Sequence, residues 1–180
     1  MSPSRATASA ATLVALCLLA AAPVTAAGIT GSTGSGTYAL LGTTPTAFDY
    51  GAVALPNGTA SGQLFVSTVF QGFVIEFEGD VTCVTVDPAT HRAWIGGVIT
   101  ANRSAHPSYT TARTQVGHDI WFRVVDYGEG AAAPADRASF VGFEGDLDIP
   151  TSAAYCALQP WADGNARTWA VTDGNIQVRD

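Results

Sequence analysis

Lysine is absent from this sequence, whose positive charge comes from eight arginines set against fifteen acidic residues. The net charge of −7 leaves no basic patch that could bind a polyanion. Because nucleic acids and anionic membrane surfaces are bound through clusters of basic side chains, both are disfavoured as partners. We therefore expect an acidic protein with no nucleic-acid partner.

Long apolar runs are also lacking. The longest, at residues 13–22, is too short to cross a bilayer, which needs about 20 residues. Arg5 precedes this run and small residues follow it at 24–27, which is the pattern of a cleaved secretory signal. The sequence thus predicts a signal peptide at residues 1–27, a secreted protein of the periplasm or the extracellular space, and no stable membrane insertion.

Cysteine is scarce as well. Cys17 lies in the leader, so that Cys83 and Cys156 remain in the mature chain. An even pair in an exported protein is most simply a disulfide, and closing a loop of this length stabilises a fold by about 4 kcal/mol in the chain-entropy treatment. We predict this disulfide; the alternative is two buried free thiols.

Sustained helical periodicity is missing outside the leader, whereas short segments with a period of two recur between turn residues. In the clearest of them, Phe73, Ile75 and Phe77 face one way, and Glu76 and Glu78 face the other. About eight to ten such segments predict an all-β fold. A single antiparallel β-barrel is favoured over a two-sheet β-sandwich, because the strands expected near the two ends of the mature chain can pair and remove exposed edges.

The chain is long enough for one domain after loss of the leader. Residues 28–36 are rich in Gly, Ser and Thr and predict a flexible segment, followed by a single β domain at 37–180. Residues 80–100 predict a central hairpin. Gly96 and Gly97 lie within its second strand, where glycine indicates a bulge, a bend or a close backbone approach.

Two groups of alternating carboxylates are candidate sites: Glu76, Glu78 and Asp80 in one segment, and Glu144, Asp146 and Asp148 in another. Such oxygens are suitable ligands for Ca²⁺, although no D-x-D-x-D-G loop is present. The simpler interpretation is a solvated outer face of the barrel. No other cofactor is expected.

A third acidic group, Asp126, Glu129 and Asp136, surrounds a glycine-rich loop next to Arg137. It has two interpretations: a clamp for a cation or another ligand, and turn capping by carboxylates with an ion pair to Arg137. Turn capping is favoured because it explains the same residues without a ligand.

Known catalytic and metal-binding patterns are absent. The three histidines have no H-x-H or H-E-x-x-H spacing, and no G-x-S-x-G motif occurs. The aromatic residues remain as candidates for lining a pocket for an apolar or sugar ligand, although ordinary packing explains them equally well. These residues are Trp94, Trp121, Trp161, Trp169, Tyr109, Tyr127 and Tyr155.

Four motifs carry a resemblance: D-V-T-C-V-T-V (80–86), A-W-I-G-G-V-I-T (93–100), W-F-R-V-V-D-Y-G-E-G (121–130) and G-N-I-Q-V-R (174–179). With them the chain resembles a group of uncharacterised exported bacterial β-proteins that share V-T-C, I-G-G, D-x-G-E-G and C-terminal G-N-x-Q-V patterns. The resemblance covers about the C-terminal two-thirds. It implies an exported β-domain and carries over no catalytic residue. Tyr127 stands where such sequences often have Asn.

Together these patterns favour an exported, non-catalytic β-barrel that binds a small molecule or a surface component, or that stabilises an assembly. The alternative is an enzyme of cyclase-like or glycan-acting type, working at the mouth of the barrel with acidic residues as acid and base. The size and contents of the largest cavity distinguish the two hypotheses.

Overall fold

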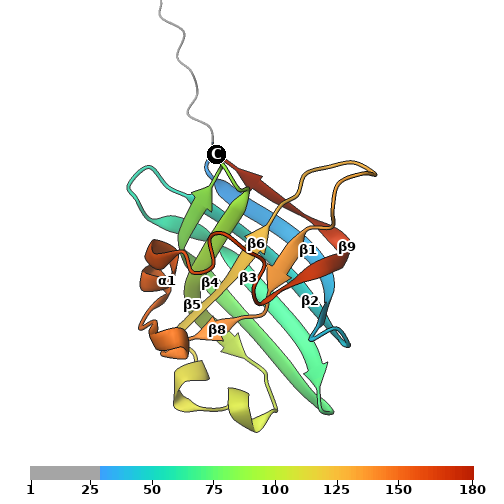
Figure 1. Ribbon diagram of the computed structural model, residues 1–180. Helices are drawn as coiled ribbons and strands as arrows, with labels where there is room; N and C mark the ends of the chain where they lie inside the picture. Colours follow the sequence, from blue (N-terminus) through green and yellow to red (C-terminus); the bar gives the residue numbers. More distant parts are fainter. Residues whose placement is uncertain (1–28) are drawn as a thin grey trace, which may run out of the picture.

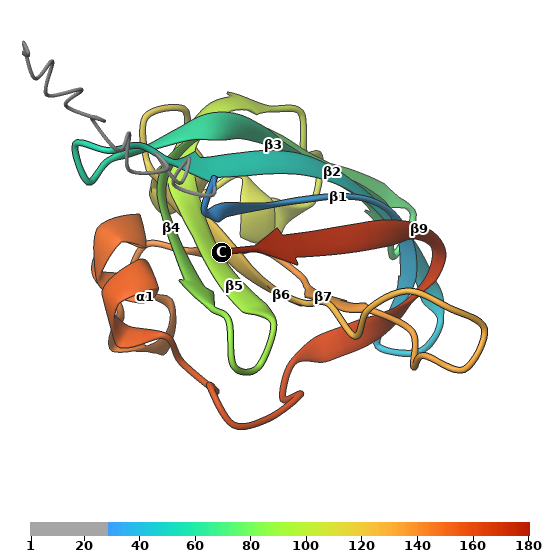
Figure 2. The same ribbon diagram turned by 90° about the horizontal axis from the view of Figure 1, so that it is seen from above.

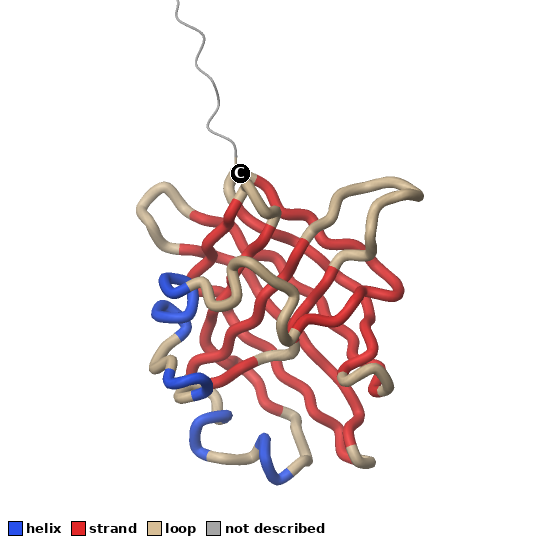
Figure 3. The backbone as a smooth tube through the Cα atoms, viewed as in Figure 1, coloured by secondary structure: helices blue, strands red, loops and turns tan. Residues whose placement is uncertain are grey.

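The structure, a computed structural model, describes residues 29–180; the expected signal peptide at 1–27 lies outside this range. Strands dominate the described chain, as the red tube in Figure 3 shows. In chain order the elements are β1 (Gly31–Leu40), β2 (Thr44–Ala54), β3 (Ala60–Phe70), β4 (Phe73–Asp87), β5 (Arg92–Asn102), η1 (Pro107–Tyr109), η2 (Ala112–Thr114), β6 (Asp119–Val125), β7 (Arg137–Ser139), β8 (Gly142–Phe143), η3 (Asp146–Asp148), α1 (Ser152–Leu158) and β9 (Thr168–Arg179).

The strands form a closed antiparallel barrel (Figures 1 and 2). Each strand from β1 to β6 pairs with the next along the chain, β7 pairs with β6 and β9, and β9 returns to pair with β1. Eight strands complete the wall, and the short strand β8 is an additional partner of β6. The predicted all-β fold is confirmed, and the barrel rather than the sandwich is the architecture.

Closure corrects the prediction of a flexible segment at 28–36. Residues from Gly31 onward belong to β1, which is hydrogen-bonded to β2 on one side and to β9 on the other. The glycines permit this close pairing: a Cβ atom on Gly31 would lie 2.4 Å from the Ala52 carbonyl oxygen, and one on Gly36 would lie 2.2 Å from that of Asp173. A composition that suggested flexibility therefore serves tight backbone packing.

The barrel interior is filled by side chains. As the alternation predicted, Ile75 and Phe77 point inward and are almost completely buried. Aromatic rings pack across the interior, with ring centroids 4.9 Å apart in the pair of Tyr50 and Phe122. The gap beside Tyr38, Tyr50 and Phe122 is about 10 Å³, roughly the room needed by one water molecule. This part of the core is therefore filled by side chains.

The central hairpin is formed by β4 and β5, as predicted. The register shifts between Val81 and Cys83, so the β4 strand bulges opposite the double glycine of β5. A Cβ atom on Gly97 would lie 2.2 Å from the carbonyl oxygen of Asp80, which confirms the expected close backbone approach.

Residues 144–167, between β8 and β9, form a layer outside the barrel that sequence patterns did not predict. Asp146–Asp148 is a 3₁₀ turn, although the alternation of its carboxylates is typical of a strand, and Cys156 lies on the short helix α1. Figure 2 shows α1 outside the wall, beside β4 and β5. This layer buries Trp94 and Trp121, which project from the outer faces of β5 and β6. Both the inner and the outer face of β5 and β6 are therefore apolar here, so these strands lack the alternation expected of a half-buried strand.

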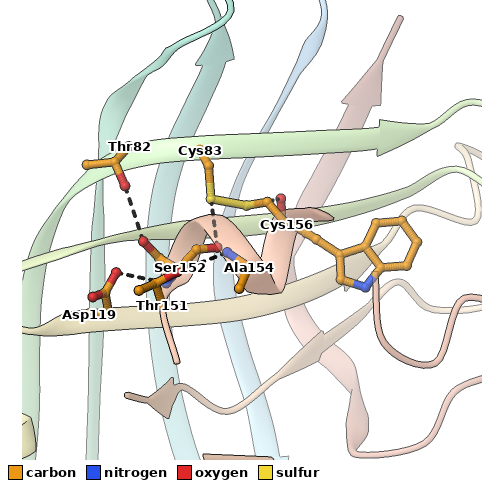
Figure 4. The surroundings of a disulfide bond; sticks show 8 residues. Thr82, Cys83, Asp119, Thr151, Ser152, Ala154 and Cys156 are labelled. Atoms are coloured by element: carbon orange, nitrogen blue, oxygen red, sulfur yellow. Dashed lines mark hydrogen bonds between the residues drawn. A yellow bond between two sulfur atoms is a disulfide. The ribbon is translucent and has the colours of Figure 1, made fainter. Parts of the chain in front are cut away.

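The predicted disulfide between Cys83 and Cys156 fastens α1 to β4, with an S–S distance of 2.07 Å. Figure 4 shows the polar contacts that seat the start of the helix. Thr151 caps it by accepting the Ala154 N–H, and Asp119 of β6 accepts the Ser152 N–H at 2.8 Å. The helix is thus tied to the wall at both its ends.

Within residues 29–180, no helix is long and apolar enough to cross a membrane.

Substitution of Gly97 tests the close approach of β4 and β5. We expect Gly97→Ala to lower the free energy of unfolding by about 2 kcal/mol or more, because the added methyl group meets a backbone oxygen that cannot move freely. Gly51→Ala is the matched control, since no atom lies within 4 Å of its added Cβ. Urea unfolding followed by tryptophan fluorescence gives both values; equal effects would contradict the account.

Removal of the disulfide tests how α1 is held. The double variant Cys83→Ser/Cys156→Ser should lose about 2–4 kcal/mol of stability, because the unfolded chain regains the entropy of an open loop. Chemical denaturation measures this loss. Alkylation of the unreduced, unfolded wild-type protein should label neither cysteine of the pair, and labelling of both would refute the bridge.

Candidate functional site

The acidic group of β4 lies on the outer face of the barrel. Arg103, which follows β5, places its Nη1 atom 3.1 Å from Glu76 Oε1 and 2.5 Å from Glu78 Oε1. Asp80 is exposed. These exposed ion pairs contribute little in salt solution, and the arrangement matches the solvated outer face that the sequence favoured.

The second acidic group does not join the first. Glu144 Oε2 lies 2.9 Å from Nδ1 of His118, and Asp146 Oδ1 lies 2.6 Å from Nη1 of Arg113. Each of these acids is thus paired with a different loop residue. Among residues 29–180, no group of three His, Cys, Asp or Glu side chains is placed to share a metal ion.

Asp126 and Glu129 fasten the loop between β6 and β7 to β9. Asp126 Oδ1 accepts the N–H of Gly128 at 2.7 Å, and its Oδ2 accepts the N–H of Val178 at 2.9 Å. Glu129 Oε1 accepts from the Asn175 amide at 2.9 Å. Both oxygens of Asp126 are therefore used to hold backbone.

Asp136 has the same role from the other end of the loop. Its two oxygens accept the N–H groups of Tyr127 and Ile176, each at 2.9 Å. Burial raises the pKa of Asp136, although these two N–H groups favour its ionised form. The ion pair expected with Arg137 is not formed, since Arg137 donates to Thr168 instead. The geometry matches turn capping, extended to the neighbouring strand.

Asp126→Asn tests this fastening. The amide group can accept one of the two N–H groups but presents its own N–H to the other, so we expect a loss of about 1–2 kcal/mol in the free energy of unfolding. Asp173→Asn, at an exposed position of β9, makes the same change in charge. Thermal or urea denaturation at neutral pH compares them, and an equal loss in both variants would argue for a net-charge effect.

A pocket of about 390 Å³ opens in the barrel wall, and Asp146 is the one acid described above that lines it. Its volume falls within the range of small-molecule sites. Most of its lining residues are apolar, and the aromatic ones come from both the barrel and the outer layer: Phe70, Tyr109, Trp121, Phe140, Tyr155, Trp161 and Trp169.

The topology explains why the wall is open here. The pairing of β9 ends at Tyr38 on β1 and at Ser139 on β7. Past these residues, Leu40 of β1 and Phe140 of the β7–β8 connection both border the pocket. One contact spans the gap, a hydrogen bond of 3.1 Å from the Tyr38 hydroxyl to the Ser139 carbonyl. The pocket lies where β9 leaves the wall and side chains take the place of a strand.

A buried arginine holds the segment that contributes Trp161 and Arg167 to the pocket lining. Arg123, on the outer face of β6, donates to the carbonyl oxygens of Trp161 and Ala166, the latter at 2.5 Å. Its guanidinium carbon lies 5.5 Å from the centroid of the Trp161 ring. Burial lowers the pKa of Arg123, and the positive charges of Arg92 and Arg137 act in the same direction. Arg123 thus donates to backbone carbonyl oxygens rather than to a carboxylate, and in doing so it positions Trp161 in the pocket lining.

Five of the seven aromatic candidates from the sequence line this pocket: Tyr109, Trp121, Tyr155, Trp161 and Trp169. The other two do not. Trp94 is buried beneath α1 and donates to the Pro160 carbonyl, and the Tyr127 hydroxyl accepts from Asn165.

Sequence reasoning missed Phe70, Phe140, Leu41 and Arg167 as pocket residues, because their proximity depends on the outer layer. The only available signal was the aromatic content of residues 155–169.

Comparison with protein-family models, with curated proteins and with solved structures finds no match to this chain. The resemblance to exported β-proteins stays a prediction, and functional inference depends on the pocket itself.

Proposed function

We propose that this protein is an exported, non-catalytic β-barrel that binds a small, largely apolar molecule in the pocket beside β9. The observation that carries the proposal is the pocket itself: about 390 Å³ in volume and lined mostly by aromatic and aliphatic side chains. Concave apolar sites with few polar groups are the usual form of small-molecule sites.

The rim of the pocket supports binding because apolar side chains are exposed there. Leu41, in the β1–β2 turn, is 67% exposed, and Leu147, in η3, is 41% exposed. Both line the pocket. Exposed apolar surface next to a cavity favours an interaction, since a bound molecule removes both from water.

The arrangement of carboxylates favours binding over the enzymatic alternative. An acid–base mechanism of the glycosidase type needs two carboxyl groups on either side of a substrate. The pocket is lined by one carboxylate, Asp146, whose oxygens accept from Arg113 and from the Phe143 N–H. The β4 acids lie on the outer face of the wall.

Export is supported by two observations. Residues 1–27 have the pattern of a secretory signal, and Cys83 and Cys156 form a disulfide, a bond that persists in oxidising compartments. The ligand is thus expected to be a molecule encountered outside the cytosol.

A neutral fluorescent amine, N-phenyl-1-naphthylamine, tests the pocket. Trp121, Trp161 and Trp169 line it, so bound dye should receive energy from tryptophan. We expect saturable binding of one dye per protein, with a dissociation constant on the order of 10 μM for a ligand of this size. Fluorescence titration with excitation of tryptophan measures it.

Two variants locate the bound dye. Val141→Trp should fill the pocket and weaken binding about tenfold, whereas Val116→Trp, on the exposed loop before β6, should leave it unchanged. Leu41→Gln removes an exposed rim side chain without disturbing the core and should weaken binding severalfold. Dye binding that is unsaturable, or insensitive to both pocket variants, would refute the proposal and would favour a surface component as the partner.

A further inference from the structure

Every polar side chain that lines the pocket, except that of Asp146, carries an N–H or O–H group that can donate a hydrogen bond. The indole N–H of Trp121 and the hydroxyl of Tyr155 have no hydrogen-bond partner among the described residues, although both residues are 2% exposed. Among all residues from 29 to 180, the side-chain N or O atoms that are sealed from solvent and unpartnered are the Nε atoms of Arg92 and Arg123, so the atoms of Trp121 and Tyr155 are not sealed. The polar atoms of Trp121 and Tyr155 therefore retain access to open space, and the pocket is the space that these residues line.

Of the two charged residues in the pocket, one is neutralised and one is not. Asp146 accepts from Arg113 at 2.6 Å and from the Phe143 N–H at 3.0 Å, so that both its oxygens are used. Arg167 is exposed, with its guanidinium carbon 5.4 Å from the centroid of the Trp161 ring. Among residues 29–180 it forms no ion pair and no side-chain hydrogen bond. The unsatisfied charge of the pocket is thus positive.

Three more arginines contact the segment that carries Arg167, which also holds the exposed Asp163. Arg92, Arg123 and Arg137 project from three neighbouring strands toward the segment at 160–168, to whose oxygen atoms they donate. All fifteen acidic side chains lie within the described residues, and none forms an ion pair with these three arginines. Four of the eight arginines thus lie on this segment or donate to it, and none of the four forms an ion pair among residues 29–180.

We infer that the pocket selects an amphipathic organic anion, with an aromatic or other apolar body held among the pocket rings and an acidic group bound by Arg167. A planar guanidinium pairs with a carboxylate or similar oxyanion through two parallel N–H donors. Trp121 and Tyr155 supply further donors and no competing negative charge. This inference rests on the proposed function and adds the chemical class of the ligand.

A matched pair of probes separates charge from shape. 1-Naphthaleneacetate and 1-naphthaleneacetamide have the same ring and nearly the same size, and only the first is ionised at pH 7. Isothermal titration calorimetry of the purified, disulfide-bonded protein should show the acid binding about fivefold more tightly than the amide, the gain expected of a partly exposed ion pair.

Three variants assign this preference to one side chain. Arg167→Gln should abolish the fivefold difference by weakening only the acid, and Arg167→Lys should retain most of it. Arg179→Gln removes an exposed arginine of β9 that does not line the pocket, so it changes the net charge equally and should leave the preference intact. Arg167 is exposed, so none of its substitutions is expected to affect folding.

Each outcome has one meaning. Equal affinity for the two probes in the wild-type protein, or a preference that persists in Arg167→Gln, would overturn the anion assignment while leaving pocket binding intact. Binding of neither probe, together with no pocket-dependent binding of N-phenyl-1-naphthylamine, would overturn the proposed function as well.

Discussion

The pairing of β9 with both β1 and β7 is the constraint on which the rest of the structure depends. Without it, the meander from β1 to β7 would be an open sheet with two unsatisfied edges. Asp126 and Asp136 reinforce this pairing, because each carboxylate joins the loop before β7 to a backbone N–H of β9. A filled interior follows from closure, since the inward faces of eight strands then converge on one core.

The pocket is a consequence of where this pairing stops. The chain leaves β9's neighbour β7, pairs briefly with β6 at β8, forms the outer layer that contains α1, and re-enters the wall at Thr168. Its absence from the wall opens a gap, and the same excursion supplies Tyr155, Trp161 and Arg167 to cover it. The disulfide and Arg123 fix the excursion at separate points. The pocket is thus lined by strand residues of the barrel together with residues of the segments that connect the strands.

Local patterns were sufficient for the barrel and insufficient for its outer layer. The alternation around Ile75 and the turn between β4 and β5 depend on neighbouring residues, and both were predicted correctly. The helix at Ser152–Leu158 has under two turns, too few for a helical period to register, and depends on Cys83 and Asp119 for its place. Most aromatic pocket residues were candidates, whereas Arg167 was not. Its lack of an acidic partner depends on where the acids lie in the folded chain, which local sequence patterns do not reveal.

The ends of the barrel sequence lie together: Gly31 at the start of β1 is the register partner of Arg179 at the end of β9, and Figure 1 shows the chain end beside the start of β1. A short linker between them, with new termini cut at the exposed turn of Gln71 and Gly72, would preserve every strand ladder in a circular permutant. Leu41 follows the opposite end of β1, about ten residues or roughly 30 Å away. A second domain joined at either end of the barrel sequence would therefore lie opposite the end of β1 at which the pocket opens.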